Sequence, residues 1–189
     1  MRKNVSWLFT SFIFLWFISC RKEHLLTNGL PPATQTGANT FGFLLNGKPW
    51  IPSGYDSYMN NLSLYLDPGY RNGVFEISAY QFFNGGTTLL NTQVGIFDSL
   101  NFMKAPVTLN MGVESLYGIS YQDTVSNSCR YMSNDTVLAN SDQISCSGQL
   151  TLTKLDKSAG IISGTFNAIL VKPGCDTMKI TEERFDMSI

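Results

Sequence analysis

The sequence predicts a single all-β domain, either an antiparallel β-sandwich or a barrel-like sheet, with about eight to ten strands. Two observations support this class. Short segments with apolar residues at every second position recur along the chain, as in residues 62–66 and 149–155, and this period is typical of half-buried strands. No window of about ten or more residues shows the i, i+3, i+4 apolar spacing of an amphipathic helix.

The start of the chain has the layout of a secretory signal peptide. Residues 1–3 include two positive charges, and residues 5–18 contain eleven apolar side chains and no charge. A helix that spans a bilayer needs about 20 apolar residues, whereas this apolar run stops at Ser19 and charged residues follow at 21–23. We therefore predict a signal peptide over residues 1–19 rather than a membrane-spanning anchor.

Cys20 is the predicted site of lipid attachment. Residues 17–20, Phe-Ile-Ser-Cys, resemble the lipobox of bacterial lipoproteins, in which a lipid is attached to the cysteine thiol and cleavage leaves that cysteine at the N-terminus. Phe17 departs from the box, which usually has leucine there. Acyl chains such as palmitate contribute about 0.8 kcal/mol for each buried CH₂ group. The predicted location is the cell envelope, with a lipid anchor in the outer membrane, on its periplasmic side or at the cell surface.

The segment that follows Cys20 is predicted to be a flexible tether over residues 20–38. It lacks helical or strand periodicity and contains Pro31-Pro32, glycines and small polar residues, a composition typical of extended linkers. His24, the one histidine of the chain, lies here. The β domain is expected over residues 39–189.

Strands and turns alternate through the first part of this domain. Residues 40–45 form a short apolar run, and Asn46-Gly47 predicts a hairpin. The return strand over 48–52 contains prolines, which confine it to an edge. Further strands are expected over 62–66, 74–83, 89–97, 106–111 and 115–122, with a helical turn near 99–104.

The last third of the chain predicts an antiparallel meander. Residues 149–155 alternate strictly, residues 161–171 return after a turn, and residues 178–189 form the final strand after a second turn. A long polar loop is expected over residues 133–147, where serine, asparagine and aspartate predominate.

Three cysteines remain after the lipid-bearing Cys20. An exported chain meets an oxidising compartment, so one disulfide is expected, with one thiol left over. Pairing the first two strands of the meander places Cys146 near Leu170, at the end of the sheet that also holds Cys175. We predict that Cys175 belongs to the disulfide, with either Cys146 or Cys129 as its partner.

Two stretches carry a resemblance to a known family. Residues 30–52 contain Leu-Pro-Pro-Ala-Thr-Gln-Thr-Gly, then Asn-Gly-Lys and a tryptophan, and residues 160–189 contain Ile-Thr-Glu-Glu-Arg-Phe-Asp. These motifs resemble a family of envelope lipoproteins of unknown function from Gram-negative bacteria, whose pattern covers most of residues 30–189. Glu183 stands where the family usually has glycine. The resemblance implies an envelope-anchored protein and carries no catalytic residue with it.

Composition excludes several classes of function. The formal net charge of −1 argues against a nucleic-acid-binding protein. Because the domain contains no histidine, Ser-His-Asp and Cys-His catalytic systems and histidine-based zinc sites are excluded, and no glycine-rich phosphate-binding motif is present. We therefore predict no catalytic residue, no metal and no cofactor, and a protein that is not an enzyme.

Aromatic residues between positions 50 and 80 are the candidate ligand platform. Trp50, Tyr55, Tyr58 and Tyr70 occur near several asparagines, and flat rings beside amides suit a glycan or a protein partner. The alternative is that these rings pack a β core. The preferred interpretation is a non-enzymatic binding or structural module.

Two other functions remain open at the level of sequence. A barrel would enclose a small apolar ligand. Glu76 with a second carboxylate such as Glu114 would provide the pair that a glycoside hydrolase requires, although exposed glutamates on a solvated strand face are common.

Overall fold

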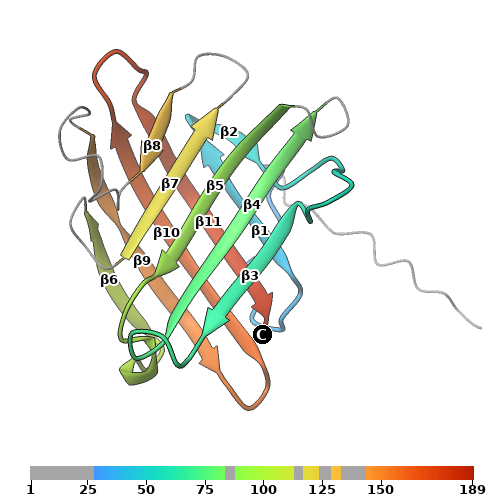
Figure 1. Ribbon diagram of the computed structural model, residues 1–189, viewed down its shortest axis with the longest axis vertical. Coiled ribbons are helices and arrows are strands. Elements are labelled where there is room, and N and C mark those ends of the chain that lie inside the picture. The colour runs from blue at the N-terminus through green and yellow to red at the C-terminus, as the bar shows by residue number, and fades with distance from the viewer. Residues whose placement is uncertain (1–27, 84–87, 113–116, 124–128, 133–143) are drawn as a thin grey trace, which may run out of the picture.

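In the computed structural model, two antiparallel β-sheets pack face to face as a sandwich (Figure 1). The structure describes residues 28–83, 88–112, 117–123, 129–132 and 144–189. These residues form eleven strands and a short 3-10 helix, η2 (Leu100–Phe102), which confirms the predicted all-β class. In the described ranges, no helix is long and apolar enough to cross a membrane.

The larger sheet has six strands. They lie in the order β2 (Lys48–Trp50), β1 (Thr40–Leu45), β11 (Met178–Ser188), β10 (Ile161–Val171), β9 (Ser145–Asp156) and β6 (Val107–Gly112). Asn46 and Gly47 form the turn between β1 and β2 with φ angles of 49° and 80°, as their tolerance of positive φ predicts. The last three strands of the chain, β9, β10 and β11, form the predicted meander. β9 begins at Ser145, so the end of the predicted 133–147 loop is strand.

The smaller sheet has five strands. They lie in the order β3 (Leu62–Asp67), β4 (Val74–Phe83), β5 (Thr88–Ile96), β7 (Tyr117–Asp123) and β8 (Arg130–Met132). The first four correspond to predicted segments. β8 was not predicted, because its three residues are too few to show alternation. With β8, the described residues form eleven strands, which is above the expected range of about eight to ten.

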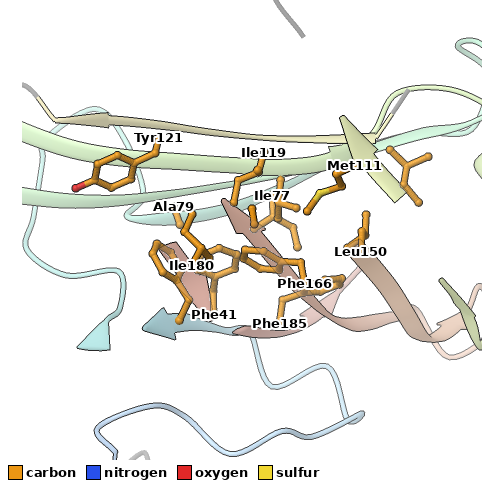
Figure 2. Packing of buried hydrophobic residues seen from close by; sticks show 14 of the residues in the cluster. Phe41, Ile77, Ala79, Met111, Ile119, Tyr121, Leu150, Phe166, Ile180 and Phe185 are labelled. Atoms are coloured by element: carbon orange, nitrogen blue, oxygen red, sulfur yellow. The ribbon is translucent and has the colours of Figure 1, made fainter. Parts of the chain in front are cut away.

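The core lies between the two sheets and is built from alternate positions of their strands. In β4, Phe75, Ile77 and Ala79 are buried while Glu76 is on the outer face, as the strand period predicts. Figure 2 shows Ile77 of the smaller sheet and Phe166 of the larger sheet pointing into the same space between the layers. Burial of this apolar surface is the main favourable contribution to folding.

The sheets form a sandwich rather than a closed barrel. In the described part of the chain, no hydrogen-bonded ladder joins an edge of one sheet to an edge of the other. Aromatic rings fill the interior: Phe43 stacks on Trp50 with ring centroids 4.8 Å apart, and Phe41 stacks on Phe166 at 5.6 Å. The barrel-like alternative is therefore wrong, because a barrel needs one sheet whose first and last strands pair, and the strands that the structure describes form two separate sheets.

Residues 28–38, which we call the docked segment, pack on the domain instead of forming part of a free tether. Leu30 is fully buried. A Cβ atom on Gly42 would lie 3.0 Å from Pro31 and 3.4 Å from Leu30, so the absence of a side chain at Gly42 leaves room for this contact. The predicted tether over residues 20–38 is thus too long, because its proline-rich half buries apolar surface against β1.

Asp186 of β11 is the main polar contact of the docked segment. Its carboxylate accepts hydrogen bonds from the Thr34 hydroxyl at 2.6 Å and from the backbone N–H groups of Thr36 and Gly37, both at 2.9 Å. Arg184 Nη1 donates to the Pro31 carbonyl oxygen at 3.3 Å. The two stretches that carry the family resemblance therefore meet in space, although about 150 residues separate them in the chain.

Candidate functional site

Trp50 is a core residue and does not belong to a surface platform. Its side chain is only 3% exposed. It lies opposite Phe43 in the β1–β2 hairpin, and both rings face the interior. Assigning Trp50 to a ligand platform is therefore incorrect, because the hairpin register places it on the inner face of the larger sheet.

The three tyrosines of the predicted platform are exposed, but they do not form one surface. Tyr55, Tyr58 and Tyr70 are 74%, 94% and 53% exposed. Tyr55 and Tyr58 precede β3, whereas Tyr70 follows it. A strand of six residues is about 20 Å long, so Tyr70, which follows β3, lies at the opposite end of this strand from the other two.

A groove lies where the sandwich opens between β1 and β3, and we call it the inter-sheet groove. Its volume is about 570 Å³. The described residues that line it are Pro31, Asn39, Thr40, Phe41, Ile51, Pro52, Asn60, Asn61, Leu62, Ser63, Leu64, Met187 and Ser188. All of them are uncharged, and they include both apolar and polar side chains. The groove therefore suits an uncharged ligand with both apolar and hydrogen-bonding groups.

The connection that carries Tyr55 and Tyr58 borders this groove. It joins Pro52 to Asn60, and both of these residues line the groove. The structure thus keeps two members of the predicted platform beside a concave site, and it separates Trp50 from them. The structure therefore has a groove with two exposed rings on the adjoining loop, instead of the predicted flat aromatic platform.

Two of the asparagine side chains in the groove already have partners within the protein. Asn39 Oδ1 accepts a hydrogen bond from the backbone N–H of Ser188 at 2.9 Å. Asn61 Nδ2 donates to the carbonyl oxygen of Gly54 at 3.3 Å. These amides hold the chain at the margins of the groove, so they have reduced capacity to bind a ligand.

Glu76, the candidate carboxylate, lies on the outer face of the smaller sheet. Its Oε1 accepts a hydrogen bond from the Ser78 hydroxyl at 3.1 Å, and Gln93 Nε2 donates to that hydroxyl at 3.5 Å. Glu76 does not line the inter-sheet groove. Its suggested partner, Glu114, lies outside the described residues.

The cysteines form one disulfide and leave one thiol. Cys175 is bonded to Cys129, and Cys146 is free and buried. Cys146 lies opposite Leu170, as the strand pairing predicts, but its side chain is in the core. Burial raises the pKa of the Cys146 thiol to about 11, so this thiol is protonated and unreactive at neutral pH. The disulfide links the β10–β11 turn to the segment before β8, and so joins the two sheets.

The sequence did not predict two buried carboxylates, those of Asp186 and Glu183, as site residues. Asp186 anchors the docked segment, and Glu183 is buried in β11 with no hydrogen-bond partner for its Oε1 in the described part of the chain. The signal that could have identified Asp186 is the run of hydroxyl and N–H donors at residues 34–37. Glu183 was noted only as a departure from the family motif.

Cys20 lies outside the described residues. Comparisons of the chain with protein-family models, with curated proteins and with solved structures found no match.

Proposed function

We propose that this protein is an envelope lipoprotein whose β-sandwich is a non-enzymatic binding module, with its ligand site in the inter-sheet groove. The observation that carries the proposal is the groove itself. It has a volume of about 570 Å³ and an uncharged lining of apolar and polar groups, which is the composition of many ligand sites. The exposed Tyr55 and Tyr58 on the adjoining loop add ring surface that a ligand can cover.

The signal-like start of the chain and Cys20 support the membrane anchor. Because residues 28–38 pack on the domain, only the residues between Cys20 and Asn28 are left as a linker. This length of chain spans at most about 28 Å when fully extended. A lipid on Cys20 would therefore hold the sandwich close to the membrane surface instead of displaying it at a distance.

The anchor is tested by metabolic labelling with palmitate. Wild-type protein expressed in a Gram-negative host is expected to incorporate the label and to fractionate with membranes, because acyl chains partition into the bilayer. The Cys20→Ser variant is expected to remain unlabelled. Equal labelling of the two proteins, or no labelling of the wild type, would contradict the anchor.

The ligand site is tested with a tryptophan that obstructs the groove. Asn60 is exposed and lines the groove, whereas Asn167 is exposed on the outer face of β10, so Asn60→Trp and Asn167→Trp make the same chemical change at two places. The wild type and both variants are applied to a glycan array and to an array of unstructured peptides. We expect Asn60→Trp to weaken binding at least about tenfold and Asn167→Trp to leave it unchanged.

Two results on the same arrays would refute this ligand site. Absence of binding by the wild type on both arrays contradicts a binding module for these ligands. Unchanged binding by the Asn60→Trp variant would show that the ligand binds outside the groove. Thermal unfolding of all three proteins shows whether a lost interaction reflects a lost fold.

A further inference from the structure

We infer that the ligand of the inter-sheet groove is an extended, uncharged segment of another polypeptide, which adds to the free edge of β3 as an additional strand. This inference rests on the proposed function, because it concerns the same groove. It identifies the chemical class of the ligand and the atoms that recognise it. The evidence lies in the backbone of β3, in its missing edge protection and in the lining of the groove.

The hydrogen-bond pattern of β3 determines which backbone groups point toward the groove. The N–H of Tyr80 in β4 donates to the carbonyl oxygen of Asn61 at 2.8 Å. In an antiparallel pair, residues alternate between those that bond to the partner strand and those whose groups point away from it. Since β3 follows directly in register, the N–H and C=O groups of Leu62, Leu64 and Leu66 point to the free edge.

The edge groups of Leu62 and Leu64 lie along the groove. Leu62 and Leu64 both line it, and β3 is the terminal strand of its sheet in the part of the chain that the structure describes. Alternate residues of a strand are about 6.6 Å apart, which is also the repeat of an extended peptide. An added strand would therefore meet paired donors and acceptors at matching intervals.

The edge of β3 lacks the features with which proteins usually protect a free strand. Such edges carry prolines, lysines or bulges that prevent pairing with another chain. The edge strand β2 of the larger sheet has this protection in Lys48 and Pro49. By contrast, β3 contains no proline or lysine, and its pairing with β4 runs without a bulge from Leu62 to Asp67. Of these two edge strands, β2 carries protective residues and β3 does not.

The lining of the groove favours a peptide over a glycan. Two of the amides that would bind sugar hydroxyls, those of Asn39 and Asn61, already bond to the protein backbone. Besides the buried Thr40 hydroxyl, which has no partner in the described part of the chain, the edge-directed hydrogen-bonding groups along the wall are those of the β3 backbone. All lining residues are uncharged, so a charged side chain directed into the groove would lose hydration without gaining a partner.

Amide hydrogen exchange of the whole domain tests strand addition directly. In the free protein we expect the amides of Leu62 and Leu64 to exchange rapidly, while those of Ser63 and Tyr65, which bond to β4, are protected. Adding an uncharged peptide selected on the peptide array is expected to slow exchange at Leu62 and Leu64 at least about tenfold. Protection of these amides in the free protein would overturn the inference, since the edge would then already be paired.

A matched pair of variants isolates the backbone donor. Leu64→Ala and Leu64→Pro both remove the leucine side chain, but only proline removes the edge-directed N–H. We expect Leu64→Pro to bind the selected peptide at least about tenfold more weakly than Leu64→Ala, with similar melting temperatures. Equal affinities would overturn the inference, and if Leu64→Pro fails to fold, the exchange measurement on the wild type still decides.

The outcomes separate this inference from the proposed function. If only glycans bind, and Asn60→Trp abolishes that binding, the groove is a ligand site but strand addition is refuted. If peptide binds while Leu62 and Leu64 stay unprotected, strand addition is likewise refuted. If the protein dimerises through this edge, as sedimentation would show, the partner is a second copy and not another protein. If nothing binds to either array, both proposals fail.

Discussion

Replacement of Asp186 by alanine is expected to lower the free energy of unfolding by about 3–5 kcal/mol. The carboxylate is almost fully buried. It accepts hydrogen bonds from the hydroxyls of Thr34, Thr36 and Ser163 and from the backbone N–H groups of Thr36, Gly37 and Ala38. Alanine would leave several of these donors buried and unpaired, and the docked segment would lose its main polar contact. Urea denaturation at pH 7 measures the loss.

Asp67 provides the matched control for this variant. Its carboxylate also accepts hydrogen bonds from two backbone N–H groups, those of Gly69 and Tyr70, but these bonds are exposed at the end of β3. We expect Asp67→Ala to cost no more than about 1 kcal/mol. If Asp186→Ala cost as little, the docked segment would not depend on this carboxylate.

The same contact makes the domain sensitive to acid. Burial raises the pKa of Asp186, but the hydrogen bonds from Thr34, Thr36, Ser163 and Gly37 together hold it well below its ordinary value of 3.8. A lowered pKa in the folded state contributes stability that is complete above the unfolded pKa of 3.8 and is lost as the pH falls below it. The Asp186→Asn variant should therefore lose this part of the acid dependence.

Replacement of Glu183 by glutamine is expected to raise the free energy of unfolding by about 2 kcal/mol at pH 8 and to change it little at pH 4. Glu183 is 4% exposed. Burial, with a smaller contribution from Glu182, raises the pKa of its carboxyl from 4.5 to about 7, against the lowering effects of its own backbone N–H and of Arg184. The ionised form is therefore costly in the fold. The expected gain is below the full ionisation cost of about 3 kcal/mol, because glutamine is also polar and buried.

The sign of this effect is opposite to that of Asp186. A raised pKa in the folded state contributes stability that is complete below the unfolded pKa of 4.5 and is lost as the pH rises to about 7. Glu76→Gln is the control, since it makes the same chemical change on the outer face of the smaller sheet. Urea denaturation of the three proteins at pH 4 and pH 8 makes the comparison. A Glu183→Gln variant that is no more stable than wild type at pH 8 would contradict an ionised, buried Glu183.

Much of the fold could be predicted because its signals are local. The alternation in β4, the Asn46-Gly47 hairpin and the C-terminal meander depend on strand period and turn chemistry, which neighbouring residues express. β8 was not predicted because three residues are too few to show the alternation of a strand. Residues 28–38 were predicted as tether because their proline-rich composition resembles a linker, while their burial depends on contacts with β1 and β11.

The candidate site was less predictable than the fold. The sequence indicates that aromatics are concentrated between residues 50 and 80, but it does not indicate which side of a strand each one occupies. The pairing of Trp50 with Phe43 places one ring in the core, and the length of β3 separates Tyr70 from Tyr55 and Tyr58. The inter-sheet groove is formed by residues between positions 31 and 64 together with Met187 and Ser188, so no local pattern indicates it.

The orientation of Glu183 differs from the one that strand alternation predicts. Ile180 of β11 faces the core, so strict alternation would turn residue 182 inward and residue 183 outward. Three steps along β11, from Thr181 to Arg184, instead match two steps along β1, from Leu44 to Gly42. This bulge carries Glu182 at a φ of 57° and turns Glu183 into the interior.

The sequence by itself determined the all-β class, most of the strands and the turns between them, because strand period and turn propensity are properties of residues close together in the chain. Only the tertiary structure decided that the docked segment packs against β11, that Cys129 rather than Cys146 bonds to Cys175, and that Glu183 is buried. These features depend on contacts between residues up to about 150 positions apart, whose alignment is set by how the two sheets pair and pack.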